Sequence, residues 1–224
     1  MSSPRILRAQ ISRDALTANA IGLAGPDAVA DLRRDAFGHG AALVAAALAD
    51  AGVTRAIADP TDRDVVTAAG VDVVDAAPTL DPRDLFGLPG GGGAPAMRLV
   101  GSVLTVKPLR AGEGVSYGST HIALADTTVA LVTGGYGQGV VRALGNRAHV
   151  EIAGNPHPIV GRVAMDVCMV DVGYAPVQVD DEVVFFGGTG PAASALAEWE
   201  AATGMRATEL VCALGLRLRR EEAA

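Results

Sequence analysis

The chain has 224 residues, of which 50% are hydrophobic and 19% charged, and its 25 acidic and 18 basic side chains give a net charge of −7. This composition excludes a disordered protein, and a negative charge without a basic run argues against binding to nucleic acid or to an anionic membrane. Two cysteines cannot build a disulfide scaffold, and the apolar runs are too short for a membrane span or a secretory signal, so we expect a soluble cytoplasmic protein.

The first half of the chain alternates between predicted strands and helices. An extended segment at residues 10–11 precedes a helix from Arg13 towards Leu23, for which Ser12 or Asp14 is the expected cap. A turn at residues 38–40 follows a charged run. The remaining predicted strands cover residues 28–31, 53–58 and 71–74, and the helices between them cover residues 41–50 and 61–69. This order is typical of parallel βαβ units.

Residues 77–96 interrupt the alternation. They contain four prolines and the run Gly90–Gly93, a composition that predicts a linker with little ability to order itself. Beyond it, short apolar segments with a period of two are separated by glycine-containing turns, which predicts a compact antiparallel β domain. Two helices are expected late in this domain, at residues 191–203 and 208–214.

Four segments carry motifs that occur together in one family. Residues 35–40 read DAFGHG, residues 111–118 read AGEGVSYG, residues 161–166 read GRVAMD, and a stretch from Thr208 leads to a basic tail. In this order they resemble the alanine racemases, which are pyridoxal-phosphate enzymes. Several ordered matches are far more specific than any one of them, and the resemblance covers nearly the whole chain.

The resemblance implies an N-terminal eight-stranded (β/α) barrel and a C-terminal β domain. A complete barrel takes about 250 residues, which exceeds this chain. We therefore expect an α+β protein in three parts: residues 1–76 as an incomplete βαβ remnant of the barrel, residues 77–96 as the Gly/Pro-rich linker left by an internal deletion, and residues 97–224 as an alanine racemase C-terminal-like antiparallel β domain. Three strands cannot close an eight-stranded ring, so the remnant should form a small open sheet.

The lysine that the family uses to hold its cofactor is replaced. That lysine forms a Schiff base with pyridoxal phosphate, the electron sink for the reaction, and serves as one of the two bases. The resemblance places it at position 33, where this chain has Arg33. A guanidinium group does not form the imine and is not a base near neutral pH. The only lysine, Lys107, falls in the β domain, and we interpret it as an exposed strand lysine.

Other family contacts to the cofactor are also altered. Phe37 and Thr208 stand where the resemblance places two tyrosines, although Thr208 keeps a hydroxyl group. The arginine that faces the pyridine nitrogen and the phosphate-binding loops belong to the part of the barrel that is missing here. We therefore expect no covalently bound cofactor. The four histidines have no metal-ligand spacing, and we expect no metal site.

Tyr117 matches the second catalytic base of the family, which acts across a dimer interface on the cofactor of the other chain. The phenol group has an unperturbed pKa of about 10 and needs a neighbouring cation to act as a base. The alternative interpretation is a tyrosine packed at the end of a hairpin.

Tyr136, Met165 and Asp166 match residues on the substrate side of the family site, and Gln138 replaces an acid near the substrate entrance. The alternatives are a glycine-rich bend around Tyr136, and a buried methionine followed by an aspartate that caps a turn.

These observations favour a degenerate alanine racemase-like protein that does not racemise alone. It would act as a homodimer, or in a heterodimer with a full-length alanine racemase, to which it could offer Tyr117. The alternative is an active pyridoxal-phosphate-dependent alanine racemase that supplies D-alanine for cell-wall precursors. A third possibility is a binder of a small molecule such as an amino acid.

Overall fold

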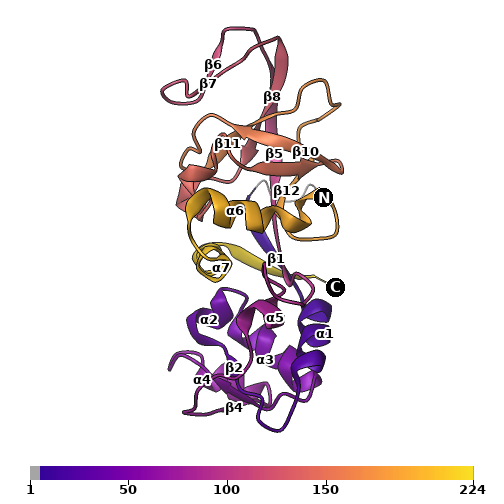
Figure 1. Ribbon diagram of the computed structural model, residues 1–224, viewed down its shortest axis with the longest axis vertical. Helices are drawn as coiled ribbons and strands as arrows, with labels where there is room; N and C mark the ends of the chain where they lie inside the picture. The colour runs from indigo at the N-terminus through magenta and orange to yellow at the C-terminus, as the bar shows by residue number, and fades with distance from the viewer. Residues whose placement is uncertain (1–5, 224) are drawn as a thin grey trace. The chain divides into compact units, whose positions relative to one another are not determined.

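The computed structural model describes residues 6–223, which divide into two compact units (Figure 1). Unit 1 consists of Arg98–Met205 together with the described residues before Ala9. Unit 2 consists of Ala9–Met97 and the chain from Arg206 onward. Within residues 6–223, no helix combines the length and the apolar character that crossing a membrane requires.

Unit 1 is built on antiparallel strands, which confirms the predicted β domain. Each strand pairs with the next in the order β12-β9-β10-β11-β8-β5, and β5 also pairs with β12. The six strands are β5 (Met97–Leu109), β8 (Thr127–Thr133), β9 (His149–Ile152), β10 (Asn155–Val160), β11 (Val167–Asp171) and β12 (Glu182–Phe186). The β5–β12 pairing closes these strands into a barrel, so the ring leaves none of them with an unpaired edge.

The turn between β9 and β10 is one of the predicted glycine-containing turns. Ile152 pairs with Asn155, so the turn consists of Ala153 and Gly154 alone. Their φ angles are 49° and 77°. Two central residues with positive φ match the right-handed twist of a tight hairpin, and Pro156 therefore falls inside β10.

Aromatic side chains of β12 and a helix fill one side of the unit 1 core. Trp199 is fully buried on α6 (Ala195–Thr203) and meets Phe185 and Phe186 edge-on, with ring centroids 6.5 and 5.4 Å apart. The single helix expected over residues 191–203 is divided, because a 3-10 turn, η3 (Pro191–Ser194), precedes α6.

A short hairpin of β6 (Gly114–Val115) and β7 (His121–Ile122) extends from the barrel of unit 1 (Figure 1). Val115 anchors the hairpin to the core of unit 1, because this side chain lies in a buried cluster with Leu109 and Val129. Two 3-10 turns, η1 (Tyr136–Gln138) and η2 (Arg142–Leu144), follow β8.

Unit 2 contains a parallel three-stranded sheet in the order β2-β3-β4, which confirms the predicted βαβ pattern. The helix α1 (Arg13–Leu23) begins where expected, since Ser12 Oγ accepts a hydrogen bond from the Ala15 amide at 3.1 Å. The strands are β2 (Ala30–Asp31), β3 (Arg55–Ile57) and β4 (Asp72–Val73), and β1 (Arg8–Ser12) pairs with β13 (Arg219–Ala223). The helices are α1 (Arg13–Leu23), α3 (Ala41–Asp50), α4 (Arg63–Ala68) and α7 (Ala207–Gly215).

The charged run after β2 forms a left-handed turn that the sequence did not predict. In α2 (Arg33–Phe37), the φ angles of Arg34, Asp35 and Ala36 lie between 53° and 57°. Left-handed backbone costs residues with a side chain roughly 1–2 kcal/mol each. The Asp35 carboxylate stabilises this conformation, because it accepts hydrogen bonds from the Ala41 amide at 2.7 Å and from the Arg220 guanidinium group.

Residues 77–96 are an ordered part of unit 2, although their composition predicts a linker. They contain α5 (Pro82–Phe86), whose Leu85 and Phe86 are buried. The amide of Asn19 donates to the carbonyl oxygens of Leu85 and Ala94 at 3.0 and 2.9 Å and accepts from the Ala94 amide at 2.8 Å. Gly93 serves close packing, since a Cβ there would lie 2.0 Å from a backbone oxygen of α5.

Candidate functional site

Two of the four sequence motifs meet in unit 1. The Ser116 hydroxyl donates a hydrogen bond to the carbonyl oxygen of Arg162 at 2.8 Å. Gly161, with φ of 75°, permits this approach, because a Cβ there would lie 2.8 Å from the Ser116 Cβ and 2.9 Å from the Val115 carbonyl oxygen. The loop that carries Tyr117 is therefore joined to the Gly161–Asp166 segment.

Tyr117 is exposed at the end of this hairpin, with 75% of its surface accessible. The expected alternative of a packed tyrosine does not fit this exposure. The guanidinium group of Arg162 lies beside the next residue, since a Cβ on Gly118 would be 3.6 Å from the Arg162 Cζ. A cation therefore lies beside the tyrosine loop, and the Tyr117 side chain is mostly accessible to solvent.

The structure also brings Tyr136, Met165 and Asp166 together. The amide of Tyr136 donates to the Ala164 carbonyl at 2.9 Å, and the next amide donates to the Met165 carbonyl at 2.8 Å. Gly135 makes this contact possible, since a Cβ there would lie only 2.1 Å from the Met165 carbonyl oxygen. Met165 is 56% exposed, so the alternative of a buried methionine is wrong.

The residues around Tyr136 are held from within their own loop. The Gln138 side chain accepts a hydrogen bond from the Gly135 amide at 2.8 Å, so the residue that replaces the family's acid stabilises the turn. The guanidinium group of Arg142 stacks over the Tyr136 ring, with 4.8 Å between its Cζ and the ring centroid. A stacked cation of this kind restricts the ring and leaves it only partly exposed.

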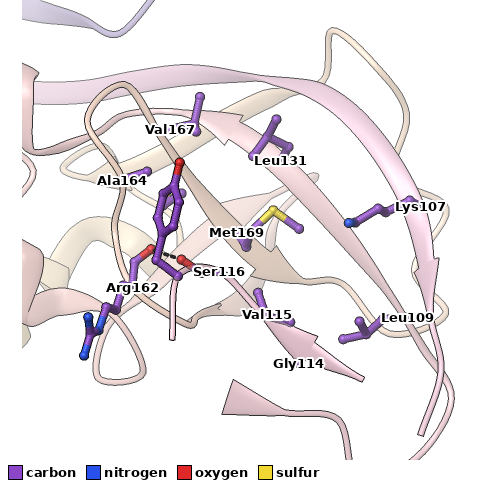
Figure 2. A pocket seen from close by; sticks show the side chains of 12 residues that line it. Lys107, Leu109, Gly114, Val115, Ser116, Leu131, Arg162, Ala164, Val167 and Met169 are labelled. Atoms are coloured by element: carbon purple, nitrogen blue, oxygen red, sulfur yellow. Dashed lines mark hydrogen bonds between the residues drawn. The ribbon is translucent and has the colours of Figure 1, made fainter. Parts of the chain in front are cut away.

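A cavity of about 230 Å³ opens beside the Tyr117 loop, wholly within unit 1 (Figure 2). Its walls come from β5, β8, β11, the Tyr117 loop and the Arg162 segment. Lys107 lines it and is exposed on its strand, as expected from the sequence. A strand places residues i and i+2 on the same face, so the buried Leu109 was the signal that Lys107 faces this side of β5.

The expected cofactor position in unit 2 is occupied by a closed ion pair. The Nε and Nη2 atoms of Arg33 donate to the Asp31 carboxylate at 2.9 and 2.6 Å, and the Arg33 amide donates to the same group at 3.1 Å. Asp31 is buried, whereas Arg33 is largely exposed. The hydrogen bonds and charge of Asp31 raise the pKa of Arg33 above its ordinary value.

Phe37 and Thr208 complete the expected cofactor positions. Phe37 lies in an aromatic cluster, with its ring centroid 5.7 Å from that of Phe86. Thr208 is half-buried on α7, which packs against α2. An imine needs an amine, and this part of the chain offers a paired guanidinium group at position 33 and an apolar ring at position 37. The residues of unit 2 therefore do not fit a covalently held pyridoxal phosphate.

His39 lies two residues after the end of α2 and is buried. No functional role was predicted for it from the sequence. Its ring stacks on Phe86 at a centroid distance of 4.2 Å, and Nδ1 lies 3.1 Å from the Ala36 carbonyl oxygen. The Nε2 atom is buried without a hydrogen-bond partner. Burial lowers the pKa of His39 to about 4, so the imidazole is neutral at physiological pH. Among the described residues, no group of three or more His, Cys, Asp or Glu side chains is arranged to hold a metal ion.

Comparisons with known proteins agree with the sequence motifs. The alanine racemase from Mycolicibacterium vanbaalenii is 51% identical over 98 residues, which cover 42% of this chain and 25% of that protein. The chain thus spans about a quarter to a third of the length of the curated relatives it matches.

Solved structures resemble the fold. Alanine racemase from D-cycloserine-producing Streptomyces lavendulae aligns with a TM-score of 0.80 and 20% identity, over 99% of this chain and 98% of that one. Alanine racemase from Bartonella henselae, solved with covalently bound pyridoxal phosphate, aligns with a TM-score of 0.79 and 16% identity, over 98% and 100% of the two chains. At these identities the likeness concerns the fold alone. Residues 96–222 match the family described as alanine racemase, C-terminal domain, and because this match covers more than half of the sequence, the chain belongs to the alanine racemase family.

Proposed function

We propose that this protein is an alanine racemase-like protein that does not racemise alone and acts by associating with a second chain. The observation that carries the proposal is the Arg33–Asp31 pair. Where the family resemblance expects an amine, a guanidinium group makes two hydrogen bonds to one buried carboxylate. Such a bidentate pair is directional and charge-assisted, and it leaves position 33 without a group that could form an imine.

The proposal gives the parts of unit 1 a role in association. Tyr117 would act as a base offered to the site of the other chain, with Tyr136, Met165 and Asp166 on the substrate side. Exposed apolar side chains in and directly after β7 supply surface that an interface uses, since Ile122 and Leu124 are 47% and 97% exposed. The second chain would be a copy of this protein or a full-length alanine racemase.

We further infer that residues 1–76 are a remnant of the family barrel, followed by a connecting segment at residues 77–96 and an alanine racemase C-terminal-like domain at residues 97–224. The three-stranded parallel sheet of unit 2 supports the remnant, because parallel strands joined by helices are the repeating unit of that barrel. The free thiols of Cys168 and Cys212 support a reducing compartment such as the cytoplasm.

Complementation between two chains tests the proposal. A full-length alanine racemase whose own second-base tyrosine is replaced by phenylalanine is mixed with this protein, and alanine racemisation and co-elution are measured. We expect the mixture to regain activity and to elute as a complex, and Tyr117→Phe to abolish the gain without preventing co-elution.

Tyr174→Phe is the matched control, since Tyr174 is 90% exposed in the same unit and lies outside the cavity and the substrate-side loops. It should complement as well as the unaltered chain. A mixture that shows neither a complex nor any gain of activity, together with a chain that remains monomeric by itself, would refute the role in association.

One observation favours the alternative of an active pyridoxal-phosphate enzyme: Lys107, the only lysine, lines the same cavity as Tyr117. An absorbance scan of the protein with pyridoxal phosphate separates the two functions. A visible absorption band that disappears in Lys107→Ala would support the enzyme, whereas the proposed function predicts no such band.

A further inference from the structure

The cavity beside the Tyr117 loop has an unpaired cation on one wall. Lys107 lines it from β5, and Figure 2 shows its amino group directed towards Met169 at the centre of the lining side chains. Within residues 6–223, no carboxylate lies within salt-bridge distance of this ammonium group, and the described residues that line the cavity include no acid. The cavity therefore carries positive charge without internal compensation.

The sheet surface beside Lys107 is apolar. Leu131, Val167 and Met169 line the cavity from β8 and β11, the strands that continue the sheet from β5 (Figure 2). Met169 also packs against the buried cluster that contains Leu109 and Val115, so this surface is fixed by the barrel core. A ligand that matches this cavity buries an apolar group against these side chains and places a negative charge at Lys107.

The volume gives the scale of a ligand that would fill this cavity, which is open to solvent on one side. At about 30 Å³ for each water molecule in the liquid, 230 Å³ corresponds to roughly eight waters, and hence to a molecule of about eight non-hydrogen atoms. Arg162 also lines the cavity, but Figure 2 shows its guanidinium group turned away from the other lining side chains. Lys107 is therefore the group that sets the orientation of a bound anion.

We propose that this cavity binds a small aliphatic monocarboxylate, with the carboxylate on the ammonium group of Lys107 and the alkyl chain on Met169, Leu131 and Val167. A compact inorganic anion would leave the apolar surface exposed to water, and a neutral molecule would leave the cation unpaired. A free amino acid would bring its own ammonium group close to Lys107 and should bind weakly. This site lies within unit 1 and needs neither a cofactor nor a second chain.

Calorimetric titration of the full chain with hexanoate, which has eight non-hydrogen atoms, tests the proposal. We expect saturable binding to one site that weakens as sodium chloride is raised, because added ions screen the charge on Lys107. Hexanamide, which has the shape without the charge, and acetate, which has the charge without the chain, should each bind at least tenfold more weakly. Alanine should also bind more weakly than hexanoate.

Substitutions at Lys107 identify the site. Lys107→Met keeps an apolar stem and should weaken hexanoate binding at least tenfold, while Lys107→Arg should keep it within a few-fold. Arg110→Met is the control, since it removes an exposed cation of the same unit that does not line the cavity. Lys107 is exposed, so the variants should keep the circular dichroism spectrum of the unaltered chain.

Equal binding of hexanoate by Lys107→Met and by the unaltered chain would overturn the proposal, as would tighter binding of hexanamide or alanine than of hexanoate. These titrations use the chain alone. They are therefore independent of the complementation experiment, and either inference can fail without the other.

Discussion

The stability of unit 2 should fall in acid because of His39. Burial lowers the pKa of this imidazole to about 4, whereas the unfolded chain takes up the proton near 6.5. Above pH 6.5 both states are neutral and the stability is complete. As the pH falls from 6.5 to 4, only the unfolded state binds a proton, so folding becomes less favourable. A difference of about 2.5 pKa units corresponds to roughly 3 kcal/mol of unfolding free energy.

The packing around His39 explains the direction. Burial of the ring, which stacks on Phe86, is the main cause of the lowered pKa, and the buried Nε2 atom has no acceptor that would stabilise an added proton. The Arg220 cation lowers the pKa further. The carbonyl groups of Ala36 and Phe37 and the Asp35 carboxylate raise the pKa and only partly offset the effect of burial.

Replacement of His39 by phenylalanine removes the titrating group and keeps a ring that can stack on Phe86. The unfolding free energy of the unaltered chain and of His39→Phe is measured in urea by circular dichroism between pH 4 and pH 8. We expect the unaltered chain to lose about 3 kcal/mol more than the variant between pH 6.5 and pH 4. His149→Gln, which removes an exposed histidine, should follow the unaltered chain. If the unfolding free energies of His39→Phe and of the unaltered chain changed with pH by the same amount, the reasoning would be refuted.

Three other predictions concern stability and reactivity. Gly161→Ala should destabilise the protein by about 1–3 kcal/mol and lower the temperature of thermal unfolding more than Gly154→Ala does. Both glycines have positive φ, but only a Cβ at Gly161 would meet neighbouring atoms. Equal losses of stability in the two variants would contradict the close contact at Gly161. Asn19→Ala should lower the unfolding free energy by about 2–3 kcal/mol, since three hydrogen bonds are lost, and should speed proteolysis within residues 87–95. Unchanged cleavage would argue against the role of Asn19 in holding this segment. The Cys168 thiol, whose pKa burial raises to about 12, should resist a thiol reagent until the chain unfolds; labelling of Cys168 in the native state, located by mass spectrometry, would contradict its burial.

Much of the secondary structure could be predicted because its signals are local. The alanine-rich segment before Gly52 predicts a helix over residues 41–50, and α3 has these bounds. Hydroxyl caps act over a few residues, and Ser12 caps α1 as expected. Closure of the barrel depends instead on β5 pairing with β12, residues far apart in the sequence, and no local pattern reports such a pairing.

Other features escaped prediction because distant groups create them. Arg34, Asp35 and Ala36 have no intrinsic preference for left-handed backbone, and the conformation relies on Arg220, almost the whole chain away. Proline and glycine content alone suggests a linker at residues 77–96, but Asn19 on α1 holds this segment through hydrogen bonds to its backbone.

The candidate site was partly accessible from the sequence. The motifs identified Tyr117, Tyr136, Met165 and Asp166, and the structure brings the last three together. It also joins the Tyr117 loop to the Gly161–Asp166 segment through the close approach at Gly161. The ion pair of Arg33 with Asp31 could not be foreseen, because the sequence shows which residue replaces the lysine but not where its guanidinium group is held.

The most direct test of the account is a racemisation assay on this chain alone. The protein is produced in a host that lacks its own alanine racemases, purified, supplied with pyridoxal phosphate and incubated with L-alanine, and the D-alanine formed is measured. We predict no more D-alanine than in a blank without protein. Formation of D-alanine in proportion to the protein added, lost on Tyr117→Phe or Lys107→Ala, would contradict the account.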